Sequence, residues 1–419
     1  MRRSLPLALA CLLAVTSALC AEEAMAPEVT LSAQDCQEFW PAVAYNSSRD
    51  QYLVVWYEDC TAPTPHRRVL SRLLQVDGQP VDGSIVVVEP DGGDGHDRMQ
   101  PAVAYDRVAD RYLVVYGYDY AGDGSDWDIH GIFLAGAGNA MVGDEMTFAA
   151  SGHHERAPVA AYSTISQKFM VSWHREDPVN GDSVWGATFA FGAAPTFFGV
   201  ATAGNRSSPD LSYDPFADRF AVSYDSVTDV YGAMVDPTGG LGAETQTAAT
   251  AELEFYSAVA SCENWQHLVA WQAYDTPGGD YDLRARFLFG NGTYDGASFA
   301  VAGYGGDELN VDIACRFGDI DYLLVFESEW AGDVFGIAGQ RMRATKVARP
   351  YFDVRAPAGG ETGVGRHPAV AGGRTGWFAA WEHKRQGSPY SDIHGRVVWE
   401  LFADGFEWGD TGCWSSVSQ

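Results

Sequence analysis

Histidine and arginine residues gather in two parts of the chain. One part reads His-His-Glu-Arg at 153–156 and is followed by His174, and the other has Arg366 and His367, followed by His383. An imidazole can act as a base near neutral pH or bind a metal ion, and a guanidinium can hold a carboxylate. These residue types suit either acid–base chemistry or the binding of an anionic ligand.

Two sets of candidate residues result. His154 and His174 are candidate acid and base residues, and Arg156 and Arg206 are candidates for neutralising an acidic substrate. The candidate ligand-binding residues are His153, His367, His383, Arg98 and Arg366. The alternative is that these residues occupy exposed loops, which tolerate histidine at any position.

Acidic, glycine-rich segments form a further group. The segment "YDYAGDGSDWD" at 118–128 contains Asp123, Asp126 and Asp128. Clustered carboxylates suit Ca²⁺, which takes six to eight oxygen ligands, but the spacing of an EF-hand loop is absent and ordinary acidic turns are the alternative. No motif requires a cofactor. The chain also lacks the HExxH and CxxC spacings of zinc sites and the GxSxG turn of serine hydrolases.

A sequence repeat reveals the elements that must position these residues. "PAVAYNSSRDQYLVVWYED" at 41–59 is nearly restated by "PAVAYDRVADRYLVVYGYD" at 101–119. Seven copies begin near Pro41, Pro101, Pro158, Pro209, Ser257, Val311 and Pro368. Each copy has a run of small apolar residues, a run that ends in an aromatic residue, a third run that in most copies resembles "DIHG" and, in most copies, a fourth run. Four short β-rich runs about every 50 residues are typical of a β-propeller blade.

We therefore expect an all-β fold, a seven-bladed β-propeller of four-stranded antiparallel blades. The seventh copy has no fourth run, and "PEVTLSA" at 27–33 has the length and position to supply it, so the N-terminal strand would close the ring. The propeller is predicted over residues 27–400. Residues 1–21 read as a secretory signal peptide, and residues 401–419 as a C-terminal tail.

Export permits disulfide bonds. Cys36, in the connection that enters blade 1, and Cys60, in the loop after its second strand, are predicted to lie on the same face of the disc, where a bridge is plausible. Cys262 and Cys315 fall at equivalent ends of the innermost strands of adjacent blades, where the sequence is equally compatible with a bridge and with two buried free thiols. Cys413 is left over in the tail.

The propeller architecture places the candidate residues on one face. In a four-stranded blade, the segment before the first strand and the loop between the second and third strands emerge together, around the mouth of the central channel. Since ligands bind in concave places of this kind, we expect the site on this face.

Charge and hydropathy narrow the partners. The chain has 27 basic and 56 acidic residues, a net charge of −29, which argues against nucleic acid. No segment after the signal peptide is a transmembrane candidate. We expect a monomer that is secreted, periplasmic or bound at the cell surface, with a carbohydrate or an extracellular protein as its partner.

The repeats resemble the "PAVAY…YLVVW…DIYG" units of bacterial secreted β-propeller proteins, and "DGFEWGDTGCW" at 404–414 is similar to the "DGFESGDTSxW" ending of many exported bacterial proteins. The resemblance implies the fold and no activity. The Asp-box of sialidases (SxDxGxxW) is absent, whereas His154 and His174 look similar to the histidine pair of propeller polysaccharide lyases. The leading hypothesis is a module that binds a carbohydrate or a protein. The alternative is a polysaccharide-degrading enzyme that cleaves a uronate-containing glycan by β-elimination on the loop face of blades 3 and 4.

Overall fold

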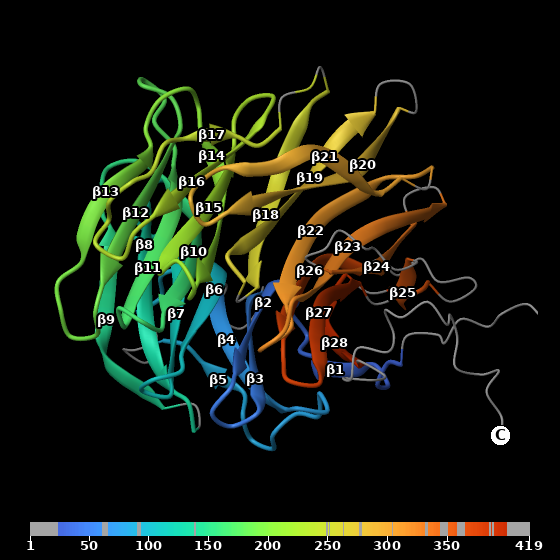
Figure 1. Cartoon of the computed structure of the whole chain (residues 1–419). Helices are drawn as coiled ribbons and strands as arrows, with labels where there is room; N and C mark the ends of the chain where they lie inside the picture. Colours follow the sequence, from blue (N-terminus) through green and yellow to red (C-terminus); the bar gives the residue numbers. More distant parts are fainter. Residues whose placement is uncertain are drawn as a thin grey trace, which may run out of the picture.

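The computed structural model describes residues 24–399, with gaps at 61–65, 90–93, 138–139, 249, 251, 263, 276–278, 304, 332–333, 344–350, 358–364, 385–386 and 388. The signal peptide and the tail, with Cys413, lie outside these residues. Strands are the only regular secondary structure among the described residues, and they form seven antiparallel four-stranded sheets. The sheets surround an axis as blades (Figure 1), which confirms the predicted seven-bladed β-propeller. The described part of the chain has no helix that is long and apolar enough to cross a membrane.

The blades follow one another along the chain. Blade 1 contains β2 (Gln37–Asn46), β3 (Gln51–Cys60), β4 (His66–Gln75) and β5 (Val86–Val87). Blade 2 contains β6 (Arg98–Asp106), β7 (Arg111–Asp119), β8 (Trp127–Ala135) and β9 (Met141–Ala149). Blade 3 contains β10 (Glu155–Ser163), β11 (Lys168–Arg175), β12 (Ser183–Phe189) and β13 (Thr196–Ala201). Blade 4 contains β14 (Ser207–Asp214), β15 (Arg219–Asp225), β16 (Val230–Val235) and β17 (Thr245–Gln246).

The last three blades repeat this order. Blade 5 contains β18 (Glu254–Cys262), β19 (Gln266–Asp275), β20 (Asp280–Phe289) and β21 (Tyr294–Ala302). Blade 6 contains β22 (Glu308–Cys315), β23 (Asp321–Ala331), β24 (Val334–Arg343) and β25 (Phe352–Arg355). Blade 7 contains β26 (Gly365–Gly372), β27 (Gly376–Lys384), β28 (Ser391–Trp399) and, as its outer strand, β1 (Val29–Ser32).

The N-terminal strand closes the ring as predicted. β1 pairs antiparallel with β28, with Val29 opposite Gly395 and Thr30 opposite His394. Ala24 extends this pairing, because its carbonyl oxygen accepts a hydrogen bond from the amide of Trp399 at 2.7 Å. In Figure 1 the blue β1 lies beside the red β28. Both ends of the described chain are thus held in one sheet, and β1 covers β28, which would otherwise be the outer edge of a three-stranded blade.

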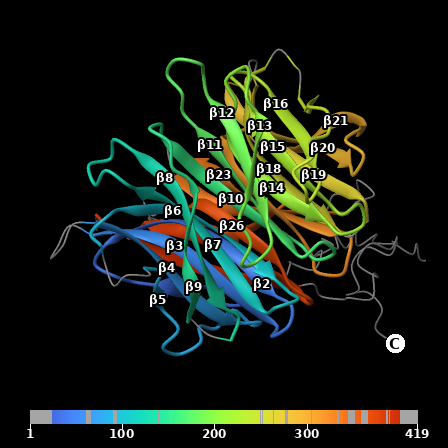
Figure 2. The same ribbon diagram turned by 90° about the vertical axis from the view of Figure 1, so that its left-hand side faces the viewer.

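The hydrophobic core lies between the blades. The inner strands β2, β6, β10, β14, β18, β22 and β26 contact one another in a closed ring. Figure 2 shows β10, β14 and β18 of this ring from another side. Seven hydrophobic clusters form, each between two adjacent blades. The aromatic residue near the end of each second strand is buried in one of these clusters or beside it; these residues are Trp56, Tyr116, Trp173, Tyr224, Trp271, Phe326 and Trp381. Both faces of a blade are therefore covered, which explains why the second run is apolar on both alternating sides.

The small residue of the third run makes room for a neighbouring side chain. A Cβ atom at Gly131 of β8 would lie 2.9 Å from Cε2 of Phe148 and 2.9 Å from the carbonyl oxygen of Val114. Both contacts are shorter than van der Waals distance. The glycine of the "DIHG" pattern is therefore explained by close packing between strands and not by a role in catalysis or binding.

Each inner strand carries a β-bulge near its beginning, where one residue has a positive φ angle. These residues are Trp40, Gln100, Ala157, Ser208, Tyr256, Asn310 and His367. The strand register shifts at each of them. Such φ values are uncommon outside glycine, but their recurrence in all seven blades makes them part of the architecture.

In several blades, the backbone amide of the bulge residue donates a hydrogen bond to a side chain of the preceding blade. The amide of Trp40 donates to Oε1 of Glu382 at 2.7 Å, and the amide of His367 donates to Oε1 of Glu327 at 2.8 Å. In both cases the acceptor is at the end of the second strand of the preceding blade. The sequence pattern contains no sign of this geometry, because the seven bulge residues share no side-chain type.

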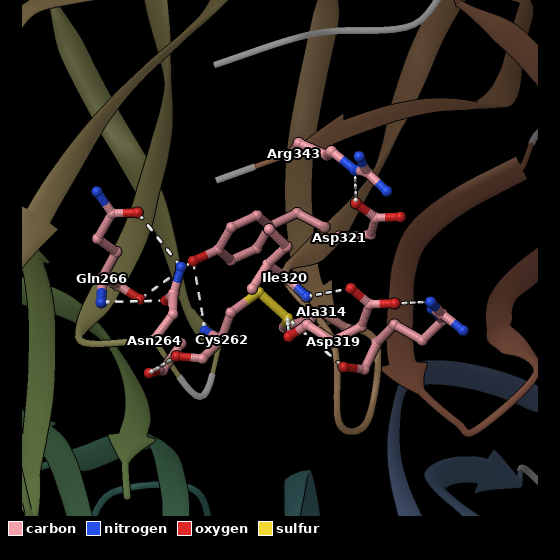
Figure 3. Close-up of a disulfide and its surroundings, with 12 residues drawn as sticks. Cys262, Asn264, Gln266, Ala314, Asp319, Ile320, Asp321 and Arg343 are labelled. Carbon is pink, nitrogen blue, oxygen red and sulfur yellow. Dashed lines mark hydrogen bonds and ion pairs between the residues drawn. A yellow bond between two sulfur atoms is a disulfide. The ribbon is translucent and has the colours of Figure 1, made fainter. Parts of the chain in front are cut away.

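The described part of the propeller contains two disulfide bonds. Cys36 and Cys60 are joined in blade 1 with their Cα atoms 4.7 Å apart. Cys262 and Cys315 are joined between blades 5 and 6 with a Cα separation of 5.2 Å, as Figure 3 shows. The first prediction is confirmed, and the second pair is a bridge rather than two free thiols.

Candidate functional site

Three predicted residues meet at one end of blade 3. Arg156 of β10 and His174 of β11 are opposite each other in the strand register. Nε2 of His174 lies 3.5 Å from Oδ2 of Asp182, and Nε of Arg156 lies 3.3 Å from Oε1 of Glu176. The amide of Glu176 donates to the carbonyl oxygen of His154 at 2.8 Å, which brings His154 to the same place.

His174 and Arg156 of this blade 3 cluster each lie beside a carboxylate. Burial lowers the pKa of His174, and the nearby carboxylates of Asp182 and Glu176 oppose this effect without reversing it. The imidazole is therefore neutral at pH 7 and can accept a proton. The cation of Arg156 is paired with a carboxylate of the same blade.

The guanidinium of Arg206 is directed away from this cluster. Its backbone amide donates to the carbonyl oxygen of Asp182 at 2.9 Å, next to the partner of His174. Its guanidinium, however, lies 4.0 Å from the ring centre of Tyr231 and 2.8 Å from Oε1 of Glu244, both in blade 4. Only 9% of Arg206 is exposed. His153 remains close to the cluster, where its charge acts on Asp177.

Arg98 is buried inside blade 2. Its exposed fraction is 1%, and Nη2 lies 2.9 Å from Oδ2 of Asp94. The guanidinium also lies 5.0 Å from the ring centre of Tyr118 and 6.0 Å from that of Tyr116. These contacts give Arg98 a structural role, since a cation at this depth depends on its partners.

Two predicted residues of blade 7, Arg366 and His367, each lie beside a glutamate. Nδ1 of His367 lies 2.8 Å from Oε1 of Glu382, and its ring meets that of Trp40 edge-on at 5.5 Å. Burial lowers the pKa of His367, but the hydrogen bond to Glu382 and the charges of Glu382 and Glu327 outweigh burial, so the net shift is upward. Arg366 forms an ion pair with Glu327, 2.5 Å apart.

His383 belongs to a different cluster. Its ring lies 4.4 Å from the ring of His394, and Nδ1 of His394 is 2.5 Å from Oε1 of Glu28. Among the described residues, two groups of three hold potential metal-ligating atoms close together, and Glu28, His383 and His394 form one of them. The other contains Cys36 and Cys60, whose sulfur atoms are engaged in the disulfide.

The calcium candidates do not form such a group. Asp123 is in an exposed turn, where hydrogen bonds from Ser125 lower its pKa. Asp128 is buried in β8, and burial together with the charge of Asp126 raises its pKa to about 6. Calcium binding therefore stays a prediction.

A pocket that is partly open to solvent lies at the other end of the axis. Its volume is about 200 Å³, and residues from all seven blades line it. These are Tyr45, Ser47, Tyr105, Arg107, Thr164, Tyr213, Pro215, Ser261, Cys315, Arg316, Phe317, Gly318 and Gly372. They come from the last residues of the inner strands and the turns that follow, whereas His174 and Arg156 lie near the opposite ends of the strands. We call this cavity the axial pocket.

Tyrosine hydroxyls and aliphatic hydroxyls make the axial pocket polar. Three tyrosine hydroxyls donate to an aspartate five residues further along the chain: Tyr45 to Asp50 at 2.5 Å, Tyr105 to Asp110 at 3.0 Å and Tyr213 to Asp218 at 2.9 Å. Burial raises the pKa of Tyr105 to about 12, so this hydroxyl is protonated. Because each hydroxyl donates to its aspartate, its oxygen retains lone pairs that can accept from a ligand.

Both charged residues of the pocket lining are arginines. Nη2 of Arg107 donates to Oγ1 of Thr164 at 3.1 Å. Nη1 of Arg316 donates to the carbonyl oxygen of Arg374 at 3.3 Å, and its side chain forms an ion pair with Asp319. Figure 3 shows Asp319 close to the bridge between Cys262 and Cys315, so the disulfide holds this wall of the pocket.

The sequence prediction did not include these pocket residues. A signal existed in the spacing Tyr-x₄-Asp, which occurs in "YNSSRD" at 45–50, "YDRVAD" at 105–110 and "YDPFAD" at 213–218. Aspartate in such turns is ordinarily explained by turn chemistry, and the pattern alone does not reveal that the tyrosines face one cavity.

Comparison with known proteins supports the fold. The chain matches no protein-family model and no curated protein. Among solved structures, polysaccharide lyase Uly1 is similar with a TM-score of 0.52 and 11% identity, over 85% of this chain and 89% of that chain. A protein of unknown function from Dyadobacter fermentans has a TM-score of 0.50 and 9% identity, over 87% and 99% of the two chains. A sialidase from Trypanosoma rangeli has a TM-score of 0.49 and 8% identity, over 86% and 55%. At these identities the likeness to the lyase and to the Dyadobacter fermentans protein shows a shared fold.

Proposed function

We propose that this protein is a glycan-binding β-propeller that holds a single carboxylate-bearing sugar residue in the axial pocket. The observation that carries the proposal is the charge of the pocket lining. In a chain with a net charge of −29, both charged residues that line the axial pocket are arginines, Arg107 and Arg316. A local cationic site of this kind selects an anion against the field of the whole protein.

The size of the pocket restricts the ligand. A cavity of about 200 Å³ is smaller than the roughly 300–1,000 Å³ of sites that hold drug-sized ligands. It suits one sugar ring rather than an oligosaccharide. A terminal residue of a glycan chain can enter such a pocket while the rest of the chain stays outside.

The lining chemistry matches an acidic sugar. Arg107 can pair with a carboxylate, because a guanidinium presents a planar fork of N–H donors that matches the two carboxylate oxygens. The hydroxyls of Ser47 and Ser261 and the tyrosine oxygens offer hydrogen-bond partners for sugar hydroxyls. Phe317 and the tyrosine rings add apolar surface for the ring face of the sugar.

The comparisons support a link to carbohydrates in general terms. Polysaccharide lyase Uly1 and the Trypanosoma rangeli sialidase are proteins whose names describe action on glycans. The two disulfides are compatible with a location outside the cytoplasm, where such glycans occur. Export through the signal peptide at 1–21 is part of the proposal.

Calorimetric titration tests the proposal with two oligosaccharides of the same linkage, one ending in glucuronate and the other in glucose. We expect the glucuronate ligand to bind more tightly, and we expect Arg107→Gln to weaken its binding by about tenfold or more, since hydrogen bonds to charged groups contribute about 1.5–3 kcal/mol. Arg49→Gln is the matched control, because Arg49 pairs with Asp110 outside the pocket lining. Equal affinity for both ligands, or equal effects of the two variants, would contradict the proposal.

A second candidate function is a lyase reaction at the blade 3 cluster. The observation that favours it is a neutral, half-buried His174 beside Arg156, which are a base and a cation of the kind that β-elimination next to a uronate carboxylate requires. Ultraviolet absorbance of the unsaturated product tests this candidate across a panel of uronate polysaccharides. A signal that disappears in His174→Ala would establish the lyase, and silence across the panel would remove it.

A further inference from the structure

Blades 2 and 7 contain the same three-strand arrangement around a histidine. His130 of β8 and His394 of β28 are both the third residue of a "DIHG" run. Each lies opposite a threonine of the outermost strand, Thr147 or Thr30. A glutamate precedes each threonine by two residues.

The histidine and the glutamate are in polar contact in each blade. Nδ1 of His130 lies 3.3 Å from Oε2 of Glu145, and Nδ1 of His394 lies 2.5 Å from Oε1 of Glu28. The third member of each group, from the second strand, is a ring that lies against the histidine. Tyr118 has this position in blade 2, with its ring 4.3 Å from that of His130.

Blade 7 differs from blade 2 at two of these positions. His383 replaces Tyr118, with a ring separation of 4.4 Å from His394. The residue opposite Tyr118 is Arg98, whose Nη2 lies 3.9 Å from Glu145, whereas the residue opposite His383 is Gly365. Blade 7 has therefore lost the cation of the inner strand and gained a second imidazole beside the carboxylate.

Both differences have the same chemical consequence. A structural histidine–glutamate pair needs neither of them, because blade 2 builds that pair with a tyrosine and an arginine. Two imidazoles and one carboxylate are a ligand set that Zn²⁺ accepts, and the ion would supply positive charge where Gly365 supplies none. We infer that Glu28, His383 and His394 form a binding site for Zn²⁺ or a similar divalent transition-metal ion.

The geometry permits this with small side-chain movements. The potential ligand atoms all lie within 4.8 Å of one another. Bonds of about 2.0–2.2 Å to a tetrahedral ion place its ligand atoms roughly 3.3 Å apart, so rotations about the side-chain bonds are sufficient. The side chains of Glu28 and His394 are 26% and 13% exposed, which gives an ion access from solvent. Arg355 is near the second carboxylate oxygen of Glu28, at 3.8 Å, and leaves Oε1 to face the imidazoles.

The test uses tag-free protein with intact disulfides, freed of metal by a chelator. Titration with ZnCl₂ in a calorimeter should show one equivalent of tight binding. Replacement of Zn²⁺ by Co²⁺ should give the visible absorption of a cobalt ion with nitrogen and oxygen ligands. Zinc should also raise the melting temperature, because a ligand that binds the folded state stabilises it.

His383→Tyr is the matched variant, because it introduces the side chain that blade 2 has at this position, Tyr118. We expect it to keep the metal-free melting temperature within a few degrees and to weaken zinc binding by at least about tenfold. Glu28→Gln, which preserves side-chain size, should also weaken binding and serves if the first variant does not fold. The inference is overturned if the unmodified protein takes up no zinc, or if His383→Tyr binds zinc as tightly as the unmodified protein.

Discussion

The guanidinium of Arg107 donates a hydrogen bond from Nη2 to Oγ1 of Thr164, 3.1 Å away. Arg107 follows the inner strand of blade 2 and Thr164 follows that of blade 3, so the bond crosses between two blades at the axial pocket. It places a cation at the lining of the cavity. This contact is the centre of the proposed binding site.

Thr164→Val tests the role of that contact. The substitution keeps the shape of the side chain but removes the hydroxyl, so Arg107 loses a positioning partner. We expect affinity for the glucuronate-terminated oligosaccharide to fall by roughly two- to tenfold, because a neutral hydrogen bond contributes about 0.5–1.5 kcal/mol. Calorimetric titration measures the change. An effect larger than that of Arg107→Gln would contradict the assignment of Arg107 as the direct contact.

The two disulfides should differ in their effect on binding. Replacing both Cys262 and Cys315 by serine should lower the free energy of unfolding by about 2–4 kcal/mol and weaken glycan binding, because Cys315 lines the pocket. The double serine variant of Cys36 and Cys60 is the control. It should lose stability and keep its affinity for the glycan, since that bridge is outside the pocket lining. Equal losses of affinity in both variants would show that the bridge between blades 5 and 6 has no specific role in the pocket.

Closure of the ring depends on the packing of β1. Leu31 is fully buried between blades 7 and 1. We expect Leu31→Ala to lower the free energy of unfolding by about 2–5 kcal/mol, the usual cost of removing a buried leucine side chain. Ile85→Ala is the control, because Ile85 is 36% exposed, and its cost should be below about 1 kcal/mol. Similar melting temperatures for the two variants would contradict the claim that the packing of β1 stabilises the closed ring.

Glu155 should make stability depend on pH. Burial is the largest effect on its pKa and raises it from 4.5 to about 7, with the charge of Asp128 in the same direction and the hydrogen bond from Ser151 and the charge of Arg175 opposing it. A carboxyl group whose pKa is raised by folding contributes stability that is present below pH 4.5 and lost as the pH rises through 7.

Glu155→Gln removes this titration and keeps a hydrogen-bond acceptor for Ser151. The variant and the unmodified protein should therefore differ most above pH 7, where the variant should be the more stable by up to about 3 kcal/mol. Thermal unfolding between about pH 4.5 and 8 measures the difference. A variant that is less stable at pH 8 would mean that ionised Glu155 is stabilised by Arg175.

Arg98 should contribute to stability and not to ligand binding. It is almost completely buried and paired with Asp94. We expect Arg98→Ala to lower the free energy of unfolding by about 3–5 kcal/mol, because it leaves a carboxylate without its cation. Affinity for the glycan should stay unchanged in folded protein. A selective loss of affinity with unchanged melting temperature would return Arg98 to the ligand-binding set.

Residue size and periodicity were sufficient to predict the fold. The repeated "PAVAY" and "DIHG" runs indicate strands whose small residues are required by close packing, as Gly131 shows. The missing fourth run of the last copy identified the closing strand, now seen as Val29–Ser32. These features are local, and each copy repeats them.

The candidate site was harder to predict because it depends on side-chain direction. The sequence places Arg206 near His174, and the backbone agrees, but Glu244 draws its guanidinium into blade 4. The axial pocket combines one or two residues from most blades, and none of these short contributions is distinctive alone. Glu28 directly precedes β1, whereas His383 is in β27 and His394 is in β28. Only the pairing of β1 with β28, which closes the ring, brings these three residues together.

A crystal structure of the protein with a glucuronate-terminated oligosaccharide tests the central claim most directly. The account predicts the terminal sugar in the axial pocket, with its carboxylate within hydrogen-bonding distance of the Arg107 guanidinium. A sugar bound instead beside His174 and Arg156 on the opposite face, with the axial pocket free of ligand, would contradict it.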